Sequence, residues 1–308
     1  MTPLRPEIVE YVQKKQGNPR PGEIPVDEFR AAALPDPEVQ GPKELVHSIE
    51  DIFIPGPTAY LPVRIYRPSN ASNLPALIYF HGGGWVLSSV DHYDVAMRSL
   101  ANKIGCVVIA VNYQKAPEHR FPIPFNDCYA TYEWVFDNAE NLGLDTSKIG
   151  IGGDSAGGNL AAAVALCARD AEAPEIAFQL LVYPCTDYQY NTESGDLYAE
   201  GFGLDRDVME YFVVEYVNRE DRNHPYAFPA HATSFEGVAP AIVCTAEYDI
   251  LRDDGASYVE KLAAARVPVN YLHFDDLNHG SWLYGGLGDF TESMHRDVAN
   301  AVKQQLGL

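Results

Sequence analysis

The sequence predicts an α/β protein with a mostly parallel central sheet of about eight strands, flanked by helices and covered at one end by a helical cap. Three observations lead to this fold class. Short apolar runs alternate with helical stretches, two glycine-rich turns directly follow such runs, and one long insertion interrupts the rhythm. Apolar runs without polar alternation are typical of strands that helices bury on both faces, as in parallel sheets.

Composition narrows the class of partner. The chain has 308 residues, of which 43 are Asp or Glu and 22 are Lys or Arg, so its formal net charge is -21. Such a surface repels nucleic-acid phosphates and anionic membranes, and no nucleic-acid partner is expected. No signal-peptide pattern and no apolar window of membrane-spanning length occurs. The five cysteines are irregularly spaced, which predicts reduced, mostly buried thiols in a cytoplasmic protein.

Residues 1–45 are rich in proline and charge. Short amphipathic helices are expected there at Pro6–Lys15 and Val26–Ala33. Nothing in this region carries a catalytic pattern, and we interpret it as an N-terminal cap segment. The main domain is placed at residues 46–308.

The main domain alternates between strands and helices. Strands are expected at His47–Ile54, Tyr60–Tyr66, Leu77–Phe80, Cys106–Val111, Ile149–Gly152, Phe178–Tyr183, Ala241–Ala246 and Val269–Phe274. Helices are expected at Tyr93–Lys103, Phe125–Asn138, Leu160–Ala168, Ala256–Ala265 and Phe290–Gln305. Because ligands bind beyond the carboxyl ends of the strands in such sheets, we expect the functional site at that edge.

Residues 187–239 break this alternation. They form a long stretch between two strands, with many aromatic residues and a helical stretch at Asp207–Asn218. A structureless loop of that length is improbable in a compact domain, so we interpret the stretch as a cap insertion.

The first glycine-rich turn carries the pattern Gly153-x-Ser155-x-Gly157 between an apolar strand and an alanine-rich helix. In that context the pattern is typical of a nucleophilic serine on a sharp turn, where glycines avoid clashes between close backbone segments. We predict an exposed Ser155 hydroxyl, with the Ala156 N–H at the helix start directed toward a developing oxyanion. Taken alone, the pattern equally fits a glycine-rich helix start with an incidental serine.

The second glycine-rich turn is His81-Gly82-Gly83-Gly84-Trp85, which follows the apolar strand Leu77–Phe80. Successive glycines let the backbone direct N–H groups at a substrate oxygen, and one such donor is worth roughly 3–4 kcal/mol of transition-state stabilisation. A phosphate-binding loop is the alternative, but no nucleotide-binding glycine pattern accompanies this turn. Both turns follow strands, so they fall at the same edge of the sheet.

A serine nucleophile needs a base, and the base needs an acid that orients it. On such a turn the acid and then the histidine follow the serine in the chain. His224 and His231 lie in the insertion. His273 lies within a strand, and His295 is expected on the solvent face of the last helix. His279 follows the last strand at the catalytic edge, and we select it as the base.

Asp249 follows the strand Ala241–Ala246 and is selected as the acid. Asp253 and Asp254 lie just before a helix and are expected to cap it, since aspartate accepts from the free N–H groups there. Glu247 could support Asp249 from close by, and Asp275 and Asp276 remain as alternatives to Asp249. A site for a metal is not expected, because no His or Cys ligand spacing accompanies the carboxylates.

Five motifs, in this order and context, resemble those of the hormone-sensitive-lipase-like (bacterial family IV type) carboxylesterases of the α/β-hydrolase fold. They are His81–Trp85, Tyr113–Glu118, Gly153–Asn159, Tyr248–Asp253 and His279–Ser281. The resemblance runs from about His47 to the end of the chain.

This resemblance implies Ser155 as nucleophile, His279 as general base and then acid, and Asp249 as the residue that orients His279. It implies oxyanion donors at the N–H groups of Gly83, Gly84 and Ala156, structural roles for His81 and Glu118, a cap over an acyl pocket, and no cofactor. Two departures stand out. Gln114-Lys115 replaces the family's Arg-Leu, which would alter a structural salt bridge, and Ser281 replaces an aromatic residue, which would widen or polarise the pocket edge.

The residues and the resemblance together predict a cytoplasmic serine carboxylesterase that hydrolyses short- to medium-chain esters of small molecules through an acyl-enzyme. The same chemistry would serve an amidase, lactonase or deacetylase of a defined metabolite. An alternative from another class is a non-catalytic small-molecule receptor on this fold, in which the histidine position is lost, whereas His279 is present here. The resemblance also implies a homodimer through the edge strand Val269–Phe274.

Overall fold

The computed structural model describes residues 2–33 and 36–308, so Met1, Leu34 and Pro35 of the predicted N-terminal cap segment lie outside the described residues. The strands are β1 (Ser48–Pro55), β2 (Tyr60–Arg67), β3 (Leu74–Phe80), β4 (Val107–Val111), β5 (Leu144–Asp154), β6 (Gln179–Val182), β7 (Ala241–Tyr248) and β8 (Val269–Asn278). The helices are α1 (Pro6–Lys15), α2 (Val26–Ala32), α3 (Pro37–Gln40), α4 (Asp94–Leu100), α5 (Ile123–Asp137), α6 (Ala156–Asp170), α7 (Glu193–Leu197), α8 (Arg206–Tyr216), α9 (Arg252–Ala264) and α10 (Phe290–Leu306).

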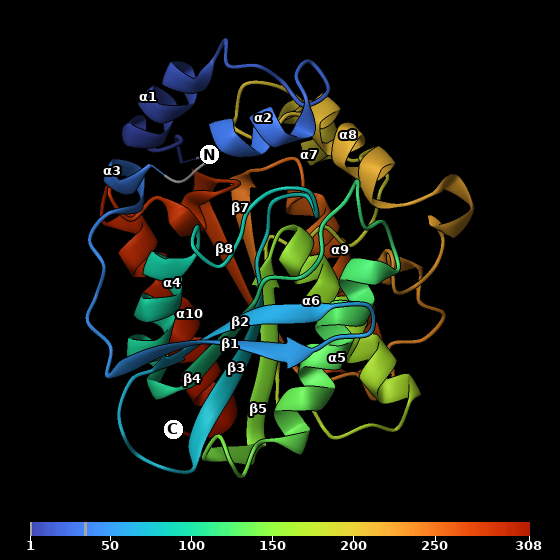
Figure 1. The fold of residues 1–308 in the computed structure, drawn as a ribbon. Coiled ribbons are helices and arrows are strands. Elements are labelled where there is room, and N and C mark those ends of the chain that lie inside the picture. Colours follow the sequence, from blue (N-terminus) through green and yellow to red (C-terminus); the bar gives the residue numbers. More distant parts are fainter. Residues whose placement is uncertain (1, 34–35) are drawn as a thin grey trace.

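Within the described residues, the eight strands form one sheet in the order β1-β2-β4-β3-β5-β6-β7-β8 (Figure 1). β2 runs antiparallel to both of its neighbours, while every pair from β4 to β8 is parallel. The predicted mostly parallel sheet of about eight strands is therefore confirmed. The carboxyl ends of β5, β7 and β8 consequently lie at one edge.

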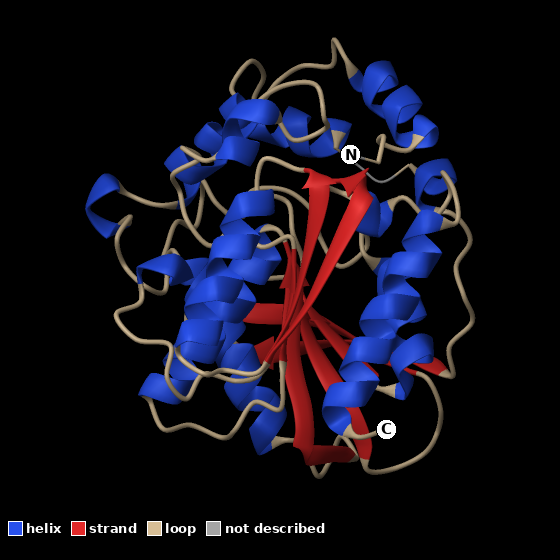
Figure 2. Ribbon diagram, turned by 180° about the vertical axis from the view of Figure 1, so that it is seen from behind, coloured by secondary structure: helices blue, strands red, loops and turns tan. Residues whose placement is uncertain are grey.

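Helices cover both faces of the sheet (Figure 2), and each face has its own hydrophobic core. Ile78 and Phe80 of β3 pack with the α5, α6 and α9 layer, whereas Leu77 and Tyr79 pack with the α4 and α10 layer. Successive strand residues point to opposite faces, so a strand buried on both sides must be apolar throughout. This explains the uninterrupted apolar runs in the sequence.

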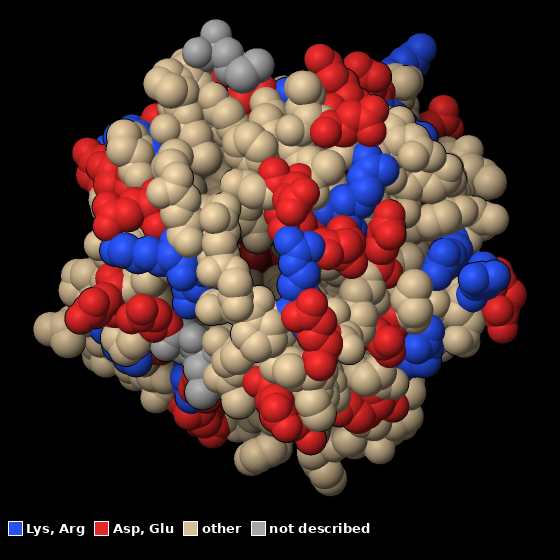
Figure 3. Space-filling view, turned by 90° about the horizontal axis from the view of Figure 1, so that it is seen from above, with Lys and Arg blue, Asp and Glu red and all other residues tan. Residues whose placement is uncertain are grey.

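Helices from two distant parts of the chain lie together over the carboxyl ends of the strands (Figure 1): α1, α2 and α3 from the N-terminal cap segment, and α7 and α8 from the insertion. Arg20 of the segment forms ion pairs with Asp205 and Asp207 of the insertion. Acidic and basic side chains interleave on this face of the molecule (Figure 3). The limits proposed for the segment and the insertion stay predictions.

One expected helix changes type along its length, and one expected side-chain orientation was wrong. The helix expected at Tyr93–Lys103 is α4 followed by a π-helix at Ala101–Gly105. His295 does not face solvent, because it is 3% exposed and its ring bonds to Ser99 Oγ and to the Trp282 carbonyl, both at 3.0 Å. Burial lowers the pKa of His295 to about 4, so this ring stays neutral inside the α10 interface.

The sequence also led to expectations about the cysteines and about membrane-spanning helices. All five cysteines are free, and all except the half-buried Cys167 are buried, as expected. Among the described helices, none combines the length and the apolar character that crossing a bilayer requires.

Candidate active site

Ser155 occupies the turn between β5 and α6. Its backbone has φ 54° and ψ -121°, a conformation that costs a non-glycine residue of order 1–3 kcal/mol. A Cβ on Gly153 would collide with the Gly157 backbone, and one on Gly157 would collide with the carbonyl of Phe80. The two glycines of the pattern are therefore required by close backbone approach, as predicted.

Three side chains from the ends of β5, β7 and β8 form a chain of hydrogen bonds. Ser155 Oγ lies 2.9 Å from His279 Nε2, and His279 Nδ1 lies 2.8 Å from Asp249 Oδ2. The structure therefore brings together the three residues selected from the sequence. The hydroxyl is not exposed as expected, because Ser155 is only 6% accessible beneath the cap.

Asp249 is held on both of its oxygens. Its second oxygen, Oδ1, accepts from the Leu251 N–H at 2.9 Å, and the residue is 1% exposed. The ring of Tyr183 packs at 4.4 Å from the His279 ring. Asp249 and His279 are thus fixed in position before any ligand binds.

The alternative residues lie elsewhere. Asp275 accepts from Thr2, and Asp276 pairs with Arg5 of the N-terminal cap segment. The ring of His273, on β8, bonds to Thr245 and Glu247. None of these contacts involves Ser155 or His279. In the part of the chain that the structure describes, no cluster of three or more His, Cys, Asp or Glu side chains could hold a metal ion.

Asp253 and Asp254 were expected to cap α9, and this expectation was wrong. α9 already begins at Arg252, and its two carboxylates accept instead from the cap insertion and from Thr186 directly before it. Asp253 accepts from the Ser194 N–H at 2.8 Å. Asp254 accepts from the N–H and the hydroxyl of Thr186, and burial raises its pKa to about 7.

The glycine loop after β3 presents unpaired amides. Gly83 and Gly84 have φ of 109° and 60°, a left-handed backbone that glycine adopts without strain. Among the described residues, no hydrogen-bond acceptor is found for the N–H groups of Gly83, Gly84 or Ala156. A Cβ on Gly84 would collide with the ring of Phe212 from α8, so the cap packs directly on this loop.

A buried carboxylate holds the glycine loop from below. Asp154 accepts from the hydroxyls of Tyr79 at 2.9 Å and Tyr93 at 2.7 Å, and from the Gly82 N–H at 3.1 Å. Burial raises the pKa of Asp154, although these hydrogen bonds oppose the shift. The Tyr113 hydroxyl also donates to the His81 carbonyl at 2.8 Å. The loop is therefore fixed by the residue directly before Ser155.

The two departures from the family's motifs have structural explanations. Gln114 bonds to Asp127 and Thr58, while Lys115 donates to Asn112 Oδ1 at 2.9 Å. Burial lowers the pKa of Lys115 to about 8. The hydroxyl of Ser281 is fully buried and bonds to Asn278. Ser281 therefore closes the turn at residues 278–281, which contains His279, and does not polarise a pocket edge.

Sequence analysis missed the contacts that attach the cap to these loops. Arg30 of α2 donates to the carbonyls of Val86 at 2.9 Å and Ala116 at 2.8 Å, and binds both oxygens of Glu118 at 2.7 Å. Arg30 lowers the pKa of Glu118 to about 2. Asn159 links the Trp85 indole to the Ala227 carbonyl of the insertion. In the sequence, the only indication of these contacts was Glu118, because it belongs to the motif Tyr113–Glu118.

A cavity of about 380 Å³ reaches Leu283 and Tyr284, a few residues after His279, but neither Ser155 nor His279 is in its lining. Its lining includes Tyr11 and Phe29 from the N-terminal cap segment, together with Ser88 and Tyr284. Gly203, also in the lining, lies so close to Asn278 that a Cβ there would be 2.8 Å from its amide nitrogen. The cavity is mainly apolar in character and is walled by both parts of the cap.

Comparisons with known proteins agree with this fold. The sequence profile described as alpha/beta hydrolase fold matches residues 77–283. The chain is 41% identical to a carboxylesterase, NlhH, of Mycobacterium tuberculosis, over 71% of this chain and 70% of the relative. It is 34% identical to the carboxylic ester hydrolase LipN of the same organism, over 89% of this chain and 73% of the relative.

Solved structures extend the likeness to the whole chain. An ester-hydrolase from the metagenome of Lake Arreo superposes with a TM-score of 0.93 at 33% identity, over 99% of this chain and 100% of the other. A hyperthermophilic esterase from Pyrobaculum calidifontis has a TM-score of 0.92 at 35% identity, over 99% of each chain. The cap is included in this coverage.

Proposed function

Because the chain belongs to the α/β-hydrolase fold family, among its hormone-sensitive-lipase-like carboxylic ester hydrolases, we propose that it is a serine carboxylesterase acting through Ser155, His279 and Asp249. The observation that carries this proposal is the pair of hydrogen bonds from Ser155 Oγ to His279 and from His279 to Asp249, at 2.9 and 2.8 Å. Nucleophile, base and orienting acid within such distances are the arrangement that activates a serine.

Acylation begins with attack of Ser155 Oγ on the ester carbonyl carbon, while the hydroxyl proton moves to His279 Nε2. The carbonyl oxygen becomes an oxyanion, which the amides of Gly83, Gly84 and Ala156 would bind; each such donor is worth roughly 3–4 kcal/mol. The tetrahedral intermediate then collapses. The alcohol leaves with the proton from His279, and the acyl group remains on Ser155.

Deacylation repeats these steps with water. His279 takes a proton from water as the hydroxide attacks the acyl carbon, and the same amides bind the second oxyanion. When this intermediate collapses, Ser155 recovers its proton from His279 and the carboxylic acid departs. No other group is needed to balance the protons.

We propose short- to medium-chain acyl esters as substrates. The support is the family resemblance. The cavity of about 380 Å³ walled by both parts of the cap has the size usual for small-molecule sites, but Ser155 is not in its lining.

The test is a rate series with p-nitrophenyl esters from acetate to palmitate, using purified protein and the variants Ser155→Ala and His279→Ala. Turnover should peak at short or medium chains, and each variant should lose roughly a thousandfold or more of kcat. Near-normal turnover in either variant would reject its assigned role, and peak turnover at palmitate would reject the chain-length preference.

His273→Ala is a matched control for His279→Ala. Both histidines belong to the β8 region, but the His273 ring bonds to Thr245 and Glu247. Its loss should leave kcat within a few-fold of wild type. Equal losses in the two variants would mean that the effect comes from disturbing β8.

Two alternatives share the fold. An amidase, lactonase or deacetylase of a defined metabolite would hydrolyse few of these esters but would still depend on Ser155. A binding protein would turn over none of them and would show no difference between wild type and Ser155→Ala. A panel of amides and lactones separates the first alternative from the second.

The homodimer is proposed on the same family resemblance, supported by the position of β8 at the end of the sheet. An edge strand offers unpaired backbone groups to a second copy, and Tyr271 on this strand is 41% exposed. Light scattering at micromolar concentration should give the dimer mass. A monomer at that concentration would reject the proposal.

A further inference from the structure

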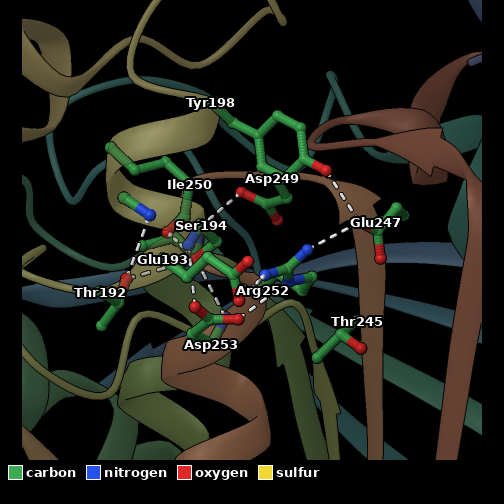
Figure 4. Close-up of polar contacts among 12 residues, drawn as sticks. Thr192, Glu193, Ser194, Tyr198, Thr245, Glu247, Asp249, Ile250, Arg252 and Asp253 are labelled. Atoms are coloured by element: carbon green, nitrogen blue, oxygen red, sulfur yellow. Dashed lines mark hydrogen bonds and ion pairs between the residues drawn. The ribbon is translucent and has the colours of Figure 1, made fainter. Parts of the chain in front are cut away.

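The short helix α7 of the cap insertion lies directly against the loop that carries Asp249 (Figure 4). Thr192 begins this helix by accepting from the Gly195 N–H at 3.0 Å. Ser194, in its first turn, is fully buried. A buried hydroxyl without a partner is costly, so the partners of Ser194 matter.

The hydroxyl of Ser194 bridges two backbone groups of the acid loop. It donates to the Ile250 carbonyl at 3.0 Å and accepts from the Asp253 N–H at 3.2 Å. The backbone N–H of Ser194 in turn donates to Asp253 Oδ2 at 2.8 Å. One residue of the cap therefore makes three contacts with the segment that follows Asp249.

The Ile250 carbonyl belongs to the peptide unit whose N–H is that of Leu251. That N–H donates to Asp249 Oδ1 at 2.9 Å, while Asp249 Oδ2 accepts from His279. A peptide unit is planar and rigid, so fixing its oxygen also fixes the direction of its N–H. Hydrogen bonds joined in series through one amide also strengthen one another.

The far side of the acid loop is held by a second set of contacts (Figure 4). Glu247, two residues before Asp249, accepts from the Tyr198 hydroxyl at 2.7 Å and from Arg252 at 2.6 Å. Arg252 also pairs with Asp253 at 2.8 Å. These contacts hold the ends of the loop, whereas the Ser194 hydroxyl is the one that contacts the peptide unit bound to Asp249.

We propose that Ser194 is a positioning residue for Asp249. It acts through the peptide unit between Ile250 and Leu251, so that the cap insertion takes part in orienting the base as well as covering the site. This inference rests on the catalytic roles proposed for Ser155, His279 and Asp249. Without the Ser194 hydroxyl, the peptide unit would be free to tilt, and Asp249 would orient His279 less well.

The experiment compares Ser194→Ala with wild type on a short-chain p-nitrophenyl ester. Loss of one positioning hydrogen bond, about 1.4 kcal/mol, should lower kcat roughly tenfold. KM should change less than about twofold, because Ser194 does not contact substrate. Rates are divided by the concentration of active sites titrated with a phosphonate ester, so that misfolded protein is not counted.

Thr186→Val is the matched control. Thr186 lies directly before the insertion and is also fully buried, and its hydroxyl binds α9 through Asp254. If Ser194 mattered only as an attachment of the cap, the two variants would lose similar activity. We expect Thr186→Val to retain at least half of wild-type kcat.

A double-mutant cycle with Asp249→Ala tests whether the effect of Ser194→Ala on kcat depends on Asp249. If Ser194 acts through Asp249, Ser194→Ala should cost less than about twofold when Asp249 is already absent. An equal tenfold loss in both backgrounds would overturn the proposal, as would an unchanged kcat in the single variant. If Ser155→Ala stayed active, the proposed function itself would fail, which is a separate result.

Should Ser194→Ala not fold, Ser194→Cys takes its place. A thiol keeps a weak donor at the same position, so kcat should fall between two- and tenfold, and again only where Asp249 is present. Full activity of the cysteine variant, or a loss that Asp249→Ala does not remove, would contradict the inference.

Discussion

The two parts of the cap are attached to the molecule in different ways. The insertion is anchored by buried residues, whereas the N-terminal cap segment lies on the surface and is held mainly by polar contacts. In α8 of the insertion, Met209, Phe212, Val213 and Tyr216 are buried. In the segment, α1 buries Ile8 and Val12, and α2 and α3 bury none of their described residues.

The insertion continues the hydrophobic core that covers one face of the sheet. The Trp85 indole stacks on the Tyr216 ring at 4.3 Å, and Phe228 meets the indole edge-on at 6.0 Å. By contrast, the N-terminal cap segment is tied by Arg5 to Asp276, by Arg20 to Asp205 and Asp207, and by Arg30 to Glu118.

This difference implies that the two parts of the cap have different roles. Segments with few buried contacts open locally at small free-energy cost, while core elements open only with global unfolding. We therefore expect the N-terminal cap segment to be the part that can move away from the cavity, and the insertion to stay in place. The predictions that follow test this division.

The largest effect is expected for Phe228→Ala. Phe228 is fully buried between Trp85, Tyr188 and Tyr216. Removing a buried phenylalanine ring typically costs about 3–5 kcal/mol, and this cost should appear in the free energy of global unfolding measured with urea. A cost below about 1 kcal/mol would mean that the insertion does not belong to the core.

Ile8→Ala should affect global stability less, although Ile8 is also fully buried. Such a substitution costs about 2–5 kcal/mol where the site is part of the global fold. If the N-terminal cap segment undocks first, the global unfolding free energy should fall by less than about 2 kcal/mol. Limited proteolysis within α1 should nevertheless become much faster. A drop in the global unfolding free energy of about 2–5 kcal/mol would mean that the N-terminal cap segment and the insertion do not differ in this way.

Arg30→Ala should loosen the segment next to the glycine loop. The variant loses the bonds to the carbonyls of Val86 and Ala116 as well as the pair with Glu118. Each lost hydrogen bond weakens docking by about 1 kcal/mol, so α2 should be cleaved several-fold faster and KM should rise. Unchanged protease sensitivity would show that α2 is held by other contacts.

The two attachments should respond to pH in opposite directions. Arg30 lowers the pKa of Glu118 to about 2, so the stability from this pair is present above the ordinary value of about 4.3 and is lost as pH falls toward 2. Burial raises the pKa of Asp254, the α9 carboxylate that accepts from Thr186 and Asp187 where the insertion begins, to about 7. Its contribution is present below about 4 and is lost as pH rises through 7.

Urea unfolding of Asp254→Asn and limited proteolysis within α2 of Glu118→Gln, each followed across the relevant pH range, check the two signs. Relative to Glu118→Gln, α2 of wild type should become easier to cleave in acid. Relative to Asp254→Asn, wild type should lose stability as pH rises from about 4 to about 7. If the stability of wild type and of a variant changed in parallel with pH, the substituted residue would not be the source of the pH dependence.

Arg20→Ala should give the smallest effect. Arg20 pairs with Asp205 and Asp207 at the surface, and its side chain is 44% exposed. Exposed pairs contribute little and are screened by salt. Any difference in protease sensitivity between wild type and this variant should vanish when NaCl rises from about 0.05 to about 0.5 M. A difference that persists in salt would point to a packing role for the Arg20 stem.

The sequence predicted those features that depend on short stretches of chain. The turn at Ser155 was recognisable because Gly153 and Gly157 are required by local backbone approach. His279 and Asp249 were found because each directly follows a strand of the sheet. These strands could be identified from their uninterrupted apolar runs, since burial on both faces leaves no room for polar residues.

What the sequence did not predict depends on contacts between distant segments. Ser194, Asp254 and Arg30 carry no local signal, because their partners are 56 to 88 residues away along the chain. His295 could have been placed correctly. It lies four residues after Thr291 and three before Val298, both buried, so the periodicity of α10 puts all three on one face.

The strained backbone at Ser155 has an evolutionary consequence. A turn held at φ 54° by its surroundings destabilises the folded state by about 1–3 kcal/mol, and a glycine there would remove much of that cost together with the proposed nucleophile. Selection for folding alone would therefore not preserve the serine. Descendants that lose activity at this position would persist as stable proteins, so their abundance in a cell would say nothing about whether they still react.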